Sequence, residues 1–414
     1  SPDFTNPPVA IICHNQDFVF NNGALDTVDS GDSLSYELVN GLTGLNSSIT
    51  YSGNFSPVRP MTFFGFPNQN LQWPAGFRLD PLTGDLLFRP TQVNQVAIVV
   101  IEVKEWRKVN GTMQVVGRTR RDMQIIVIPC PNNKVPKILP PYSKQACAGQ
   151  TTCITITTDD DDTGDTVKIS WNRGIRGATF TNNNGSVKHA SGEVCWTPTK
   201  NDISNIPYTF TITARDDACP LAGQSVRAFS IFVRETPEAE VSTEVLTCGR
   251  VAINHTPEKS YAGYQFSYVI RDSLNRGVWS GNQQVDTAFL QPGIYRLFLN
   301  MQTSTPCFNI VTDTIEIPDF VQVTIPSDTF ICNGYPMTIN SSTRGGNSPY
   351  EYEWRRLADT TDSLLTTSAN IIINPDTSQR YVVQVKDDNG CFNWDTVNVA
   401  WKPLPAVDLG PDKR

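Results

Sequence analysis

The C-terminal half of the sequence repeats with an 84-residue period. Two pairs of cysteines show this spacing, Cys248 with Cys332 and Cys307 with Cys391. An alternating run of aromatic and apolar residues that begins at Phe266 recurs at Tyr350, with the same offset. A repeat of this length is one structural module in a linear array. We therefore predict two successive copies of one module, at residues 237–322 and 323–403.

The last residues of the chain continue this period. The segment VDLGPD at 407–412 corresponds to VTIPSD at 323–328. We expect residues 404–414 to form the first strand of a further repeat. Since the chain begins with SPDFTNPP, without Met or a basic and apolar signal region, we interpret it as a piece of a longer exported protein.

A less regular repeat relates two modules in the N-terminal half. LFRPT at 87–91 matches CWTPT at 195–199, whereas DSGDSL at 29–34 matches DTGDTV at 162–167 with a larger offset. The difference between the two offsets indicates an insertion in the first module, near residues 51–73. The predicted modules are residues 1–135, which carry the insertion, and residues 136–236.

Short strand signals fill the chain. Segments such as FVFNN, CITITT, YTFTITARD and AFSIFV are rich in β-branched and aromatic residues and are bounded by turn formers. Helical periodicity over ten or more residues is hard to find. The sequence therefore predicts an all-β fold, an elongated tandem array of four β-sandwich domains. The first is expected to be Ig-like, the second Ig-like or cadherin-like, and the last two PKD-like or Ig-like.

Charge and hydropathy exclude two kinds of partner. The chain has 41 acidic and 33 basic residues and a net charge of −8, which argues against binding to nucleic acid. The longest uninterrupted apolar run is 96–101, far shorter than the roughly 20 residues that span a bilayer. We expect no nucleic-acid partner and no membrane span in this chain.

The ten cysteines divide among the predicted modules as two, four, two and two. Even numbers are typical of disulfides formed in an oxidising compartment. Zinc is the alternative, but no C-x-x-C occurs and the three histidines, His14, His189 and His255, fall in three different modules. We expect disulfides within each module and an extracellular protein. In the four-cysteine module the residues alone leave three connectivities open.

The same scatter of histidines argues against catalysis. No Ser–His–Asp or Cys–His arrangement can be assembled within one module, and the G-x-S-x-G and H-E-x-x-H motifs are absent. Paired carboxylates of the glycosidase kind stay open, because Asp and Glu are common. We expect this chain not to be an enzyme and expect no nucleotide cofactor.

An acidic loop in the second module is the strongest candidate for a metal site. It reads DDDDTGD, five carboxylates in seven residues. In an Ig-like sandwich the B–C and F–G loops share one end, which would bring Asp216 and Asp217 beside this loop. Calcium takes six to eight hard oxygen ligands from flexible loops. The predicted calcium ligands are Asp159, Asp161, Asp162, Asp165 and Asp217; a solvated acidic turn is the alternative. The first module keeps only Asp26, Asp29 and Asp32, so a site there is a weaker candidate.

The insertion at 51–73 supplies candidate aromatic residues for carbohydrate binding. They are Phe63, Phe64, Phe66 and Trp73. The alternative is that the insertion covers one open face of the first sandwich. In the fourth module, Tyr350, Tyr352 and Trp354 alternate along a strand, which favours packing in the core.

Several segments resemble one family of proteins. They include PAGFRLDPLTGDLLFRPT and GRTRRDMQIIVIPC in the first module, and GEVCWTPTK and FTITARDDACPLAG in the second. The third and fourth modules look like PKD-type and Ig-like repeats, with a C-x-G type segment early; in the fourth module PYEYEW stands in the middle and DDNGC late. Together they look like the large Bacteroidetes surface proteins that end in gliding-motility-associated sorting domains. The resemblance covers essentially the whole chain.

This resemblance implies export by the type IX secretion system and attachment at the bacterial outer surface. It implies an adhesin used in attachment and gliding, with surface polysaccharide or a substratum and the outer-membrane secretion and motility machinery as partners. An ancillary scaffold, or carbohydrate-binding modules, of a secreted multidomain enzyme is the alternative. The family pattern of early and late cysteines also implies the pairs Cys248–Cys307, Cys332–Cys391 and Cys147–Cys219, which leaves Cys153–Cys195 and Cys13–Cys130.

Overall fold

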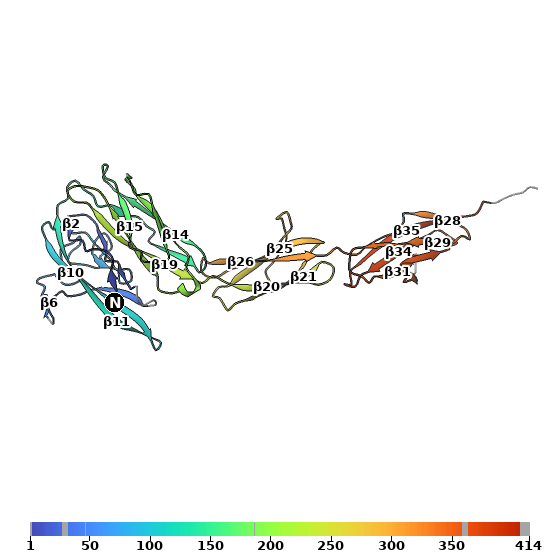
Figure 1. The fold of residues 1–414 in the computed structure, drawn as a ribbon, viewed down its shortest axis with the longest axis horizontal. Coiled ribbons are helices and arrows are strands. Elements are labelled where there is room, and N and C mark those ends of the chain that lie inside the picture. The colour runs from blue at the N-terminus through green and yellow to red at the C-terminus, as the bar shows by residue number, and fades with distance from the viewer. Residues whose placement is uncertain (1, 27–31, 46, 186, 358–362, 406–414) are drawn as a thin grey trace, which may run out of the picture. The chain divides into compact units, whose positions relative to one another are not determined.

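Almost all regular structure in the chain is β-strand (Figure 1). The computed structural model describes residues 2–26, 32–45, 47–185, 187–357 and 363–405. The chain divides into two compact units: unit 1 is 1–236 with 305–307, and unit 2 is 237–304 with 308–414. The prediction of an all-β fold built from tandem sandwiches is confirmed. The strand expected at 407–412 lies outside the described residues.

The first sandwich of unit 1 is built on a four-stranded sheet, β2-β11-β10-β5, and a three-stranded sheet, β3-β9-β8. Two small ribbons, β1-β4 and β6-β7, accompany them. The strands are β1 (Asp3–Phe4), β2 (Ile11–Cys13), β3 (Phe18–Asn21), β4 (Ala24–Leu25), β5 (Ser33–Leu38), β6 (Leu42–Gly44), β7 (Ser47–Ser48), β8 (Phe77–Leu79), β9 (Asp85–Phe88), β10 (Val96–Val109) and β11 (Thr112–Ile128).

The second sandwich of unit 1 has two four-stranded sheets, β12-β14-β17-β16 and β13-β19-β18-β15. Its elements are β12 (Lys137–Ile138), β13 (Ser143–Cys147), β14 (Thr152–Asp159), β15 (Lys168–Trp171), β16 (Thr179–Asn182), β17 (Ser191–Trp196), the short 3-10 helix η1 (Lys200–Asp202), β18 (Tyr208–Arg215) and β19 (Gln224–Arg234).

Unit 2 begins with a sandwich of the sheets β20-β21-β24 and β23-β22-β25-β26. Its strands are β20 (Ala239–Val245), β21 (Arg250–Pro257), β22 (Gln265–Arg271), β23 (Gly277–Gly281), β24 (Val285–Phe289), β25 (Gly293–Gln302) and β26 (Phe308–Ile317).

A second sandwich in unit 2 contains the five-stranded sheet β28-β35-β34-β31-β32 and the pairs β27-β30 and β29-β33. Its strands are β27 (Gln322–Thr324), β28 (Thr329–Cys332), β29 (Met337–Asn340), β30 (Ser342–Arg344), β31 (Glu351–Leu357), β32 (Ser363–Thr366), β33 (Asn370–Ile373), β34 (Gln379–Lys386) and β35 (Phe392–Lys402).

Alternating side chains explain why these segments form half-buried strands. In β14 the residues Ile154 and Ile156 are buried, whereas the threonines between and beside them face outward. In β31 the buried Trp354 lies between partly exposed neighbours, and Tyr350 and Tyr352 pack against the same core. The prediction that these aromatic residues belong to the core is confirmed. Each of the four sandwiches has its own cluster of buried apolar residues.

The 84-residue period appears directly in the strands of unit 2. Strand β26 begins at Phe308 and β35 begins at Phe392. The strands before them, β25 and β34, end at Gln302 and Lys386, with the same offset. The repeat in the sequence is therefore a repeat of the last hairpin of the sandwich.

The two sandwiches of unit 1 are joined through a buried carboxylate. Asp85, at the start of β9, is only 4% exposed. Its Oδ1 accepts hydrogen bonds from the Ala228 backbone N–H in β19 (2.9 Å) and from the Asn21 amide (2.9 Å). The Nε of Arg227 lies 3.1 Å from its Oδ2 in an ion pair. Val226, also in β19, packs into the core of the first sandwich, so β19 belongs to the packing of both.

Four disulfides are present among the described residues. Two of the expected pairs, Cys13–Cys130 and Cys153–Cys195, are confirmed. The other two bonds are Cys147–Cys307, within unit 1, and Cys248–Cys391, which joins the two sandwiches of unit 2. Cys219 and Cys332 are free. The expected pairs Cys147–Cys219, Cys248–Cys307 and Cys332–Cys391 are therefore wrong.

The wrong pairing of Cys147 with Cys219 has a geometric cause in the second sandwich of unit 1. Strand β13 runs parallel to β19, and its last residue, Cys147, pairs with Arg234 at the C-terminal end of β19. Cys219 precedes β19, which begins at Gln224. A strand of this length spans roughly 30 Å, whereas a disulfide needs Cα atoms within about 7 Å. The early and late cysteines lie at opposite ends of the sheet.

The second sandwich of unit 2 has the same arrangement. Strand β28 is parallel to β35, and Cys332 pairs with Lys402 at the end of β35. Cys391 directly precedes Phe392, where β35 begins. The even number of cysteines in each module is therefore no sign of bonds within that module.

Peptide mapping of the non-reduced chain will test this connectivity. We expect cross-linked peptides that contain Cys147 with Cys307 and Cys248 with Cys391, because these Cα atoms lie 5.5 Å and 5.1 Å apart. A thiol-alkylating reagent should label Cys219, which is exposed, without prior reduction. Recovery of a peptide that joins Cys147 to Cys219 would contradict the structure.

The stability of unit 1 should depend on pH through Asp85. Burial raises the pKa of Asp85 to about 6, from an ordinary value of 3.8, although Arg227 and the hydrogen bonds of Asn21 and Ala228 act in the opposite direction. Since the pKa is higher in the folded state, the stabilisation from this group is complete below about pH 4 and is lost as the pH rises through about 6. The change amounts to about 3 kcal/mol.

Urea unfolding of the wild type and of Asp85→Asn across this pH range will measure the effect. The difference between the two free energies of unfolding cancels the other titrating groups. It should change in favour of the wild type by about 2 kcal/mol between pH 7 and pH 4.5, and by about 3 kcal/mol once the pH is well below 3.8. If the free energies of unfolding of the two proteins changed with pH in the same way, the raised pKa of Asp85 would be contradicted.

Candidate binding cleft

A cleft of about 410 Å³ lies between the first and second sandwiches of unit 1. This volume is within the range of small-molecule sites. One wall comes from the β2–β3 turn, the β3-β9 pair and the insertion; the other comes from β12, the segment before β13, and β19. The lining residues are Asn15, Gln16, Asp17, Val19, Trp73, Leu87, Arg89, Lys134, Val135, Pro136, Lys137, Ile138, Leu139, Tyr142, Asp161, Ser225 and Arg227.

Strand alternation turns apolar side chains of β3 and β9 toward this cleft. Phe20 and Phe88 are buried in the core of the first sandwich. Their neighbours Val19 and Leu87 point to the opposite face, where they form a cross-strand pair and line the cleft. The β3-β9 pair therefore has an apolar side chain on each face.

Tyr142 forms the opposite side of the cleft in a fixed orientation. Its hydroxyl donates to the Ile138 carbonyl at 2.8 Å, and its ring meets Phe229 edge-on with centroids 5.7 Å apart. The Arg227 guanidinium lies over the ring at 4.1 Å. Burial raises the pKa of the Tyr142 hydroxyl. Its position follows from packing within the second sandwich.

Three of the cationic side chains in the cleft are paired with carboxylates. Arg89 contacts Asp17 at 2.6 Å, Lys137 contacts Asp161 at 2.8 Å, and Arg227 contacts Asp85 at 3.1 Å. Paired charges give directional donors and acceptors with little net field. Together with Trp73 and Tyr142, this lining suits a polar ligand without a strong charge.

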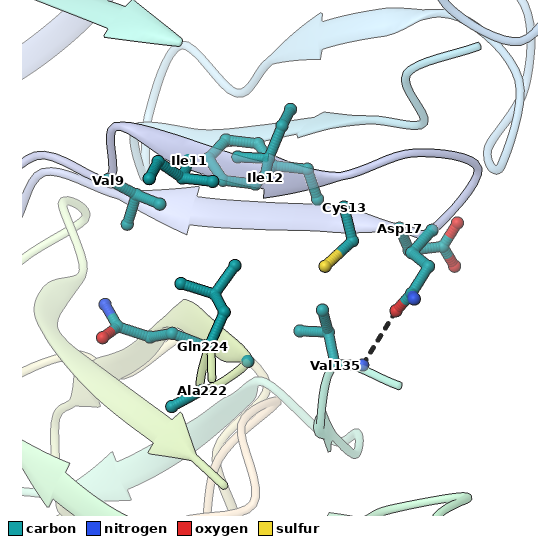
Figure 2. A pocket seen from close by; sticks show the side chains of 12 residues that line it. Val9, Ile11, Ile12, Cys13, Asp17, Val135, Ala222 and Gln224 are labelled. Atoms are coloured by element: carbon teal, nitrogen blue, oxygen red, sulfur yellow. Dashed lines mark hydrogen bonds between the residues drawn. The ribbon is translucent and has the colours of Figure 1, made fainter. Parts of the chain in front are cut away.

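A second, much smaller cavity of about 40 Å³ lies between the same two sandwiches. Figure 2 shows Val9 and Ile12 on its one side and Ala222 and Gln224 on the other. The Gln16 side chain accepts a hydrogen bond from the Val135 N–H at 2.9 Å. The sandwiches are thus in close contact here, and the larger cleft is where they separate.

The insertion both covers the core and supplies one cleft residue. Phe63 is buried, so its expected role in binding is wrong: it packs against Phe66 (5.4 Å) and Phe77 (5.6 Å). Phe66 is partly buried against the same core. Phe64 is 48% exposed, and Trp73 lines the cleft. The alternative interpretation, a cover over an open face, therefore applies to most of the insertion.

Four of the expected calcium ligands have other partners. Asp161 pairs with Lys137, and that hydrogen bond lowers the pKa of Asp161. Asp217 accepts from the Thr166 N–H (2.8 Å) and hydroxyl (2.5 Å), which lower its pKa. Asp159 lies 3.3 Å from His189 Nδ1. Asp162 accepts from the Lys134 N–H, and Asp165 is partly buried.

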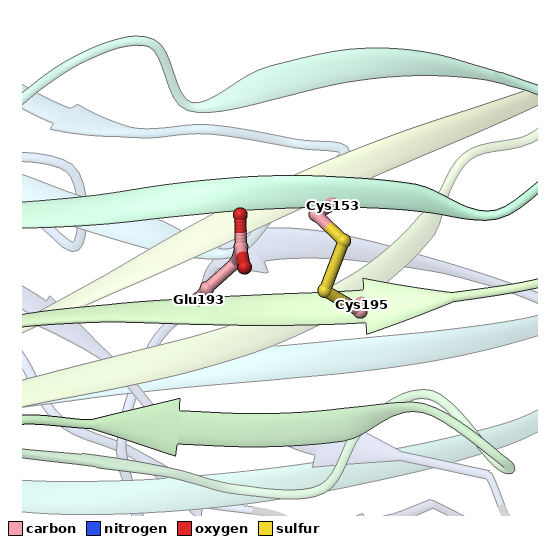
Figure 3. A group of neighbouring side chains, drawn as sticks. All are labelled: Cys153, Glu193 and Cys195. Atoms are coloured by element: carbon pink, nitrogen blue, oxygen red, sulfur yellow. A yellow bond between two sulfur atoms is a disulfide. The ribbon is translucent and has the colours of Figure 1, made fainter.

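Two other groups of potential metal ligands lie within 4.8 Å of one another among the described residues. One is Cys153, Glu193 and Cys195, but its thiols form a disulfide, as Figure 3 shows. The other is Asp26, Asp32 and Glu105 in the first sandwich. There Arg107 makes a bidentate contact with Asp32, through Nε to Oδ1 and Nη2 to Oδ2, which lowers the pKa of that carboxyl. Asp29, also considered from the sequence, lies outside the described residues.

The three histidines have unrelated surroundings. His14 lies 3.2 Å from the Thr91 carbonyl, and His189 lies beside Asp159. His255, in unit 2, is buried and its Nδ1 is 2.6 Å from the Tyr268 hydroxyl. Burial lowers the pKa of His255.

Sequence reasoning missed most of the cleft, including Tyr142, Arg227 and Asp17. A signal was present in β3 and β9. Their segments FVF and LLF are apolar on both faces, which is typical of strands with a neighbour on each side. The residues of the facing wall carry no comparable signal, because their position depends on the docking of the sandwiches.

Comparison with known proteins gave likenesses to solved structures alone. The searches of protein-family profiles and of curated proteins found no match. The insect immune protein hemolin is 12% identical over 97% of this chain and 100% of its own, with a TM-score of 0.22. The human desmocollin-1 ectodomain is 12% identical over 99% of this chain and 81% of its own, with a TM-score of 0.22.

The sialic acid binding region of a Streptococcus sanguinis adhesin is 11% identical over 66% of this chain and 78% of its own, with a TM-score of 0.27. Likenesses with scores this low bear on no function. No helix among the described residues is long and apolar enough to cross a membrane.

Proposed function

We propose that this chain is a non-enzymatic adhesion segment that acts outside the cell and binds carbohydrate in the cleft of unit 1. The observation that carries the proposal is the lining of the cleft: Trp73 and Tyr142 beside paired charges, with about 410 Å³ of space. The apolar faces of sugar rings stack on aromatic side chains, and their hydroxyls bond to paired donors and acceptors.

The construction of the cleft supports binding by a preformed site. Tyr142 is fixed by its hydrogen bond to Ile138 and by its contacts with Phe229 and Arg227. Arg227 is in turn fixed by Asp85 of the first sandwich. Side chains that are already ordered lose little entropy when a ligand binds. The paired charges favour a neutral polysaccharide over an acidic one.

The disulfides support the extracellular part of the proposal. Disulfides form and persist in oxidising compartments, and the described residues contain four. A role at the bacterial outer surface, in attachment and gliding after export by the type IX system, rests on the sequence resemblance. Surface polysaccharide or a substratum would then be the partner, and the outer-membrane secretion and motility machinery would present the protein.

Binding of the full chain to arrays of neutral and acidic polysaccharides will test this function. We expect binding to neutral glycans and a loss of at least about tenfold in affinity for Trp73→Ala, since aromatic residues in binding pockets contribute more than about 1 kcal/mol. The matched control is Trp394→Ala in unit 2, a tryptophan that is 61% exposed. It should bind as the wild type does.

Two outcomes would overturn the proposal. One is the absence of binding to every glycan by the folded wild-type chain. The other is equal affinity of the wild type and Trp73→Ala, which would place the binding surface elsewhere.

A further inference from the structure

Four buried side-chain oxygens at one end of the second sandwich have no hydrogen-bond partner. They are Asn133 Oδ1, Asp160 Oδ2, Asp165 Oδ2 and Asp216 Oδ2. Asp160 is 2% exposed and Asp216 is 5% exposed. A buried carboxylate oxygen without a partner is costly, so this arrangement calls for a compensating positive charge.

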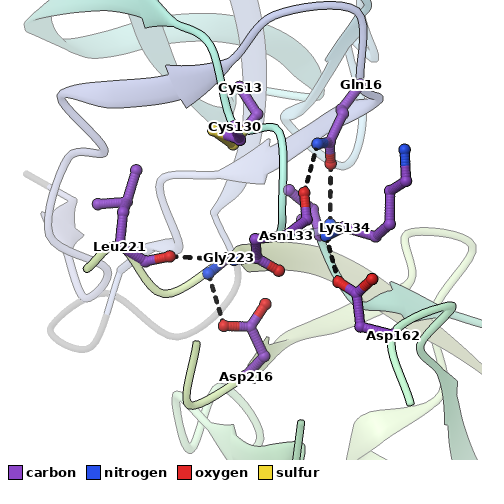
Figure 4. The surroundings of a disulfide bond; sticks show 10 residues. Cys13, Gln16, Cys130, Asn133, Lys134, Asp162, Asp216, Leu221 and Gly223 are labelled. Atoms are coloured by element: carbon purple, nitrogen blue, oxygen red, sulfur yellow. Dashed lines mark hydrogen bonds between the residues drawn. A yellow bond between two sulfur atoms is a disulfide. The ribbon is translucent and has the colours of Figure 1, made fainter. Parts of the chain in front are cut away.

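These residues come from three separate segments, and Figure 4 shows two of them, Asn133 and Asp216, near the Cys13–Cys130 disulfide. Asn133 belongs to the connection between β11 and β12, Asp160 and Asp165 follow β14, and Asp216 follows β18. Among the charges that act on the Asp160 carboxyl, those of Asp216, Asp162 and Asp165 all raise its pKa. The Asp160 carboxyl therefore lies close enough to three further acidic side chains to be affected by their charges.

Backbone hydrogen bonds orient the free oxygens. Asp216 Oδ1 accepts from the N–H groups of Gly223 (2.7 Å) and Ala218 (3.1 Å), and Asp160 Oδ1 accepts from the Asp162 N–H (2.9 Å). In both residues the second oxygen has no partner within hydrogen-bond distance, although at Asp216 burial, which raises the pKa, is opposed in part by the Asn133 side chain. The Asn133 amide donates to the Leu221 carbonyl at 3.0 Å, which turns its oxygen away from that carbonyl.

The close approach of Gly223 fits the same interpretation. A Cβ atom at this position would lie 2.5 Å from Asp216 Oδ2. Glycine therefore leaves room beside this buried oxygen, where the Cβ atom of any other residue would clash with it.

We propose that Asn133, Asp160, Asp165 and Asp216 bind a single calcium ion. Calcium accepts carboxylate and amide oxygens in irregular geometry from flexible loops and completes its shell with water. Magnesium demands a closer octahedron, which three independent loops suit poorly. The carboxylates of Asp160, Asp165 and Asp216 do not all approach within 4.8 Å of one another, unlike the two groups above. A bound ion would therefore draw the three segments together.

The ion would act on the junction of the two sandwiches. The residues after Cys130 are also held by Gln16 of the first sandwich, whose amide donates to the Asn133 carbonyl at 2.6 Å and accepts from the Val135 N–H. Calcium at Asn133 would thus connect this segment to the β14–β15 and β18–β19 loops. This function is independent of the carbohydrate cleft, and either can fail without the other.

Calorimetric titration of the chelator-treated full chain with calcium, to about 10 mM to cover the affinities of extracellular modules, will test the site. We expect one ion bound and a higher melting temperature. Asp160→Asn and Asp216→Asn should each lower the affinity at least about tenfold. Without calcium both variants should melt at or above the temperature of the wild type, because they remove an uncompensated buried charge.

The chain offers matched controls in the same loops. Asp161→Asn and Asp217→Asn remove acids that already have protein partners, and both should bind calcium as the wild type does. The proposal is overturned if calcium gives neither heat nor a melting shift, or if the control substitutions abolish binding while Asp160→Asn and Asp216→Asn retain it. Equal or tighter binding of magnesium would overturn the assignment to calcium.

Discussion

The packing of unit 1 depends on the carboxylate of Asp85, which the first sandwich inserts against a strand of the second. Strand β13 begins to pair with β19 at Ser230, so it does not cover the Ala228 N–H, and Asp85 accepts this hydrogen bond instead. Desolvation of Asp85 outweighs the attraction of Arg227, since its pKa is raised. The contact therefore specifies how the sandwiches dock more than it stabilises them.

This specificity determines the geometry of the cleft. Arg227 touches Asp85 on one side and the ring of Tyr142 on the other, so the residue that fixes the docking also forms part of the binding wall. The opposite wall, Val19 and Leu87, belongs to the same β3-β9 pair that carries Asp85. A change in docking would move both walls at once, which explains why neither sandwich could form the site alone.

The sequence was sufficient for the fold class and the repeats, because these depend on local signals. Alternating side chains, turn residues and the 84-residue offset are readable within about ten residues or by simple comparison. The sequence was not sufficient to predict the disulfide connectivity, because the connectivity depends on which end of a sheet each cysteine occupies. The parallel pairing of β13 with β19 carries Cys147 to the end of the sheet opposite Cys219, and no count of cysteines contains this information.

The acidic loop shows the same limit at the level of single residues. Its composition predicted a metal site. The sequence does not show, however, which of the five carboxylates form ion pairs or hydrogen bonds with neighbouring residues, so it cannot show which are left to bind a metal. Lys137 forms an ion pair with Asp161, and the Thr166 hydroxyl donates a hydrogen bond to Asp217. Asp160, which was not among the predicted ligands, is buried instead. Buried carboxylates of unit 1 differ in this respect. Asp85 has Arg227 opposite it and two hydrogen bonds to its Oδ1, while Oδ2 of Asp160 and Oδ2 of Asp216 have no hydrogen-bond partner. Burial alone therefore does not distinguish an ion site from a carboxylate that protein groups already neutralise; the proposed calcium site depends on oxygens that no protein group reaches.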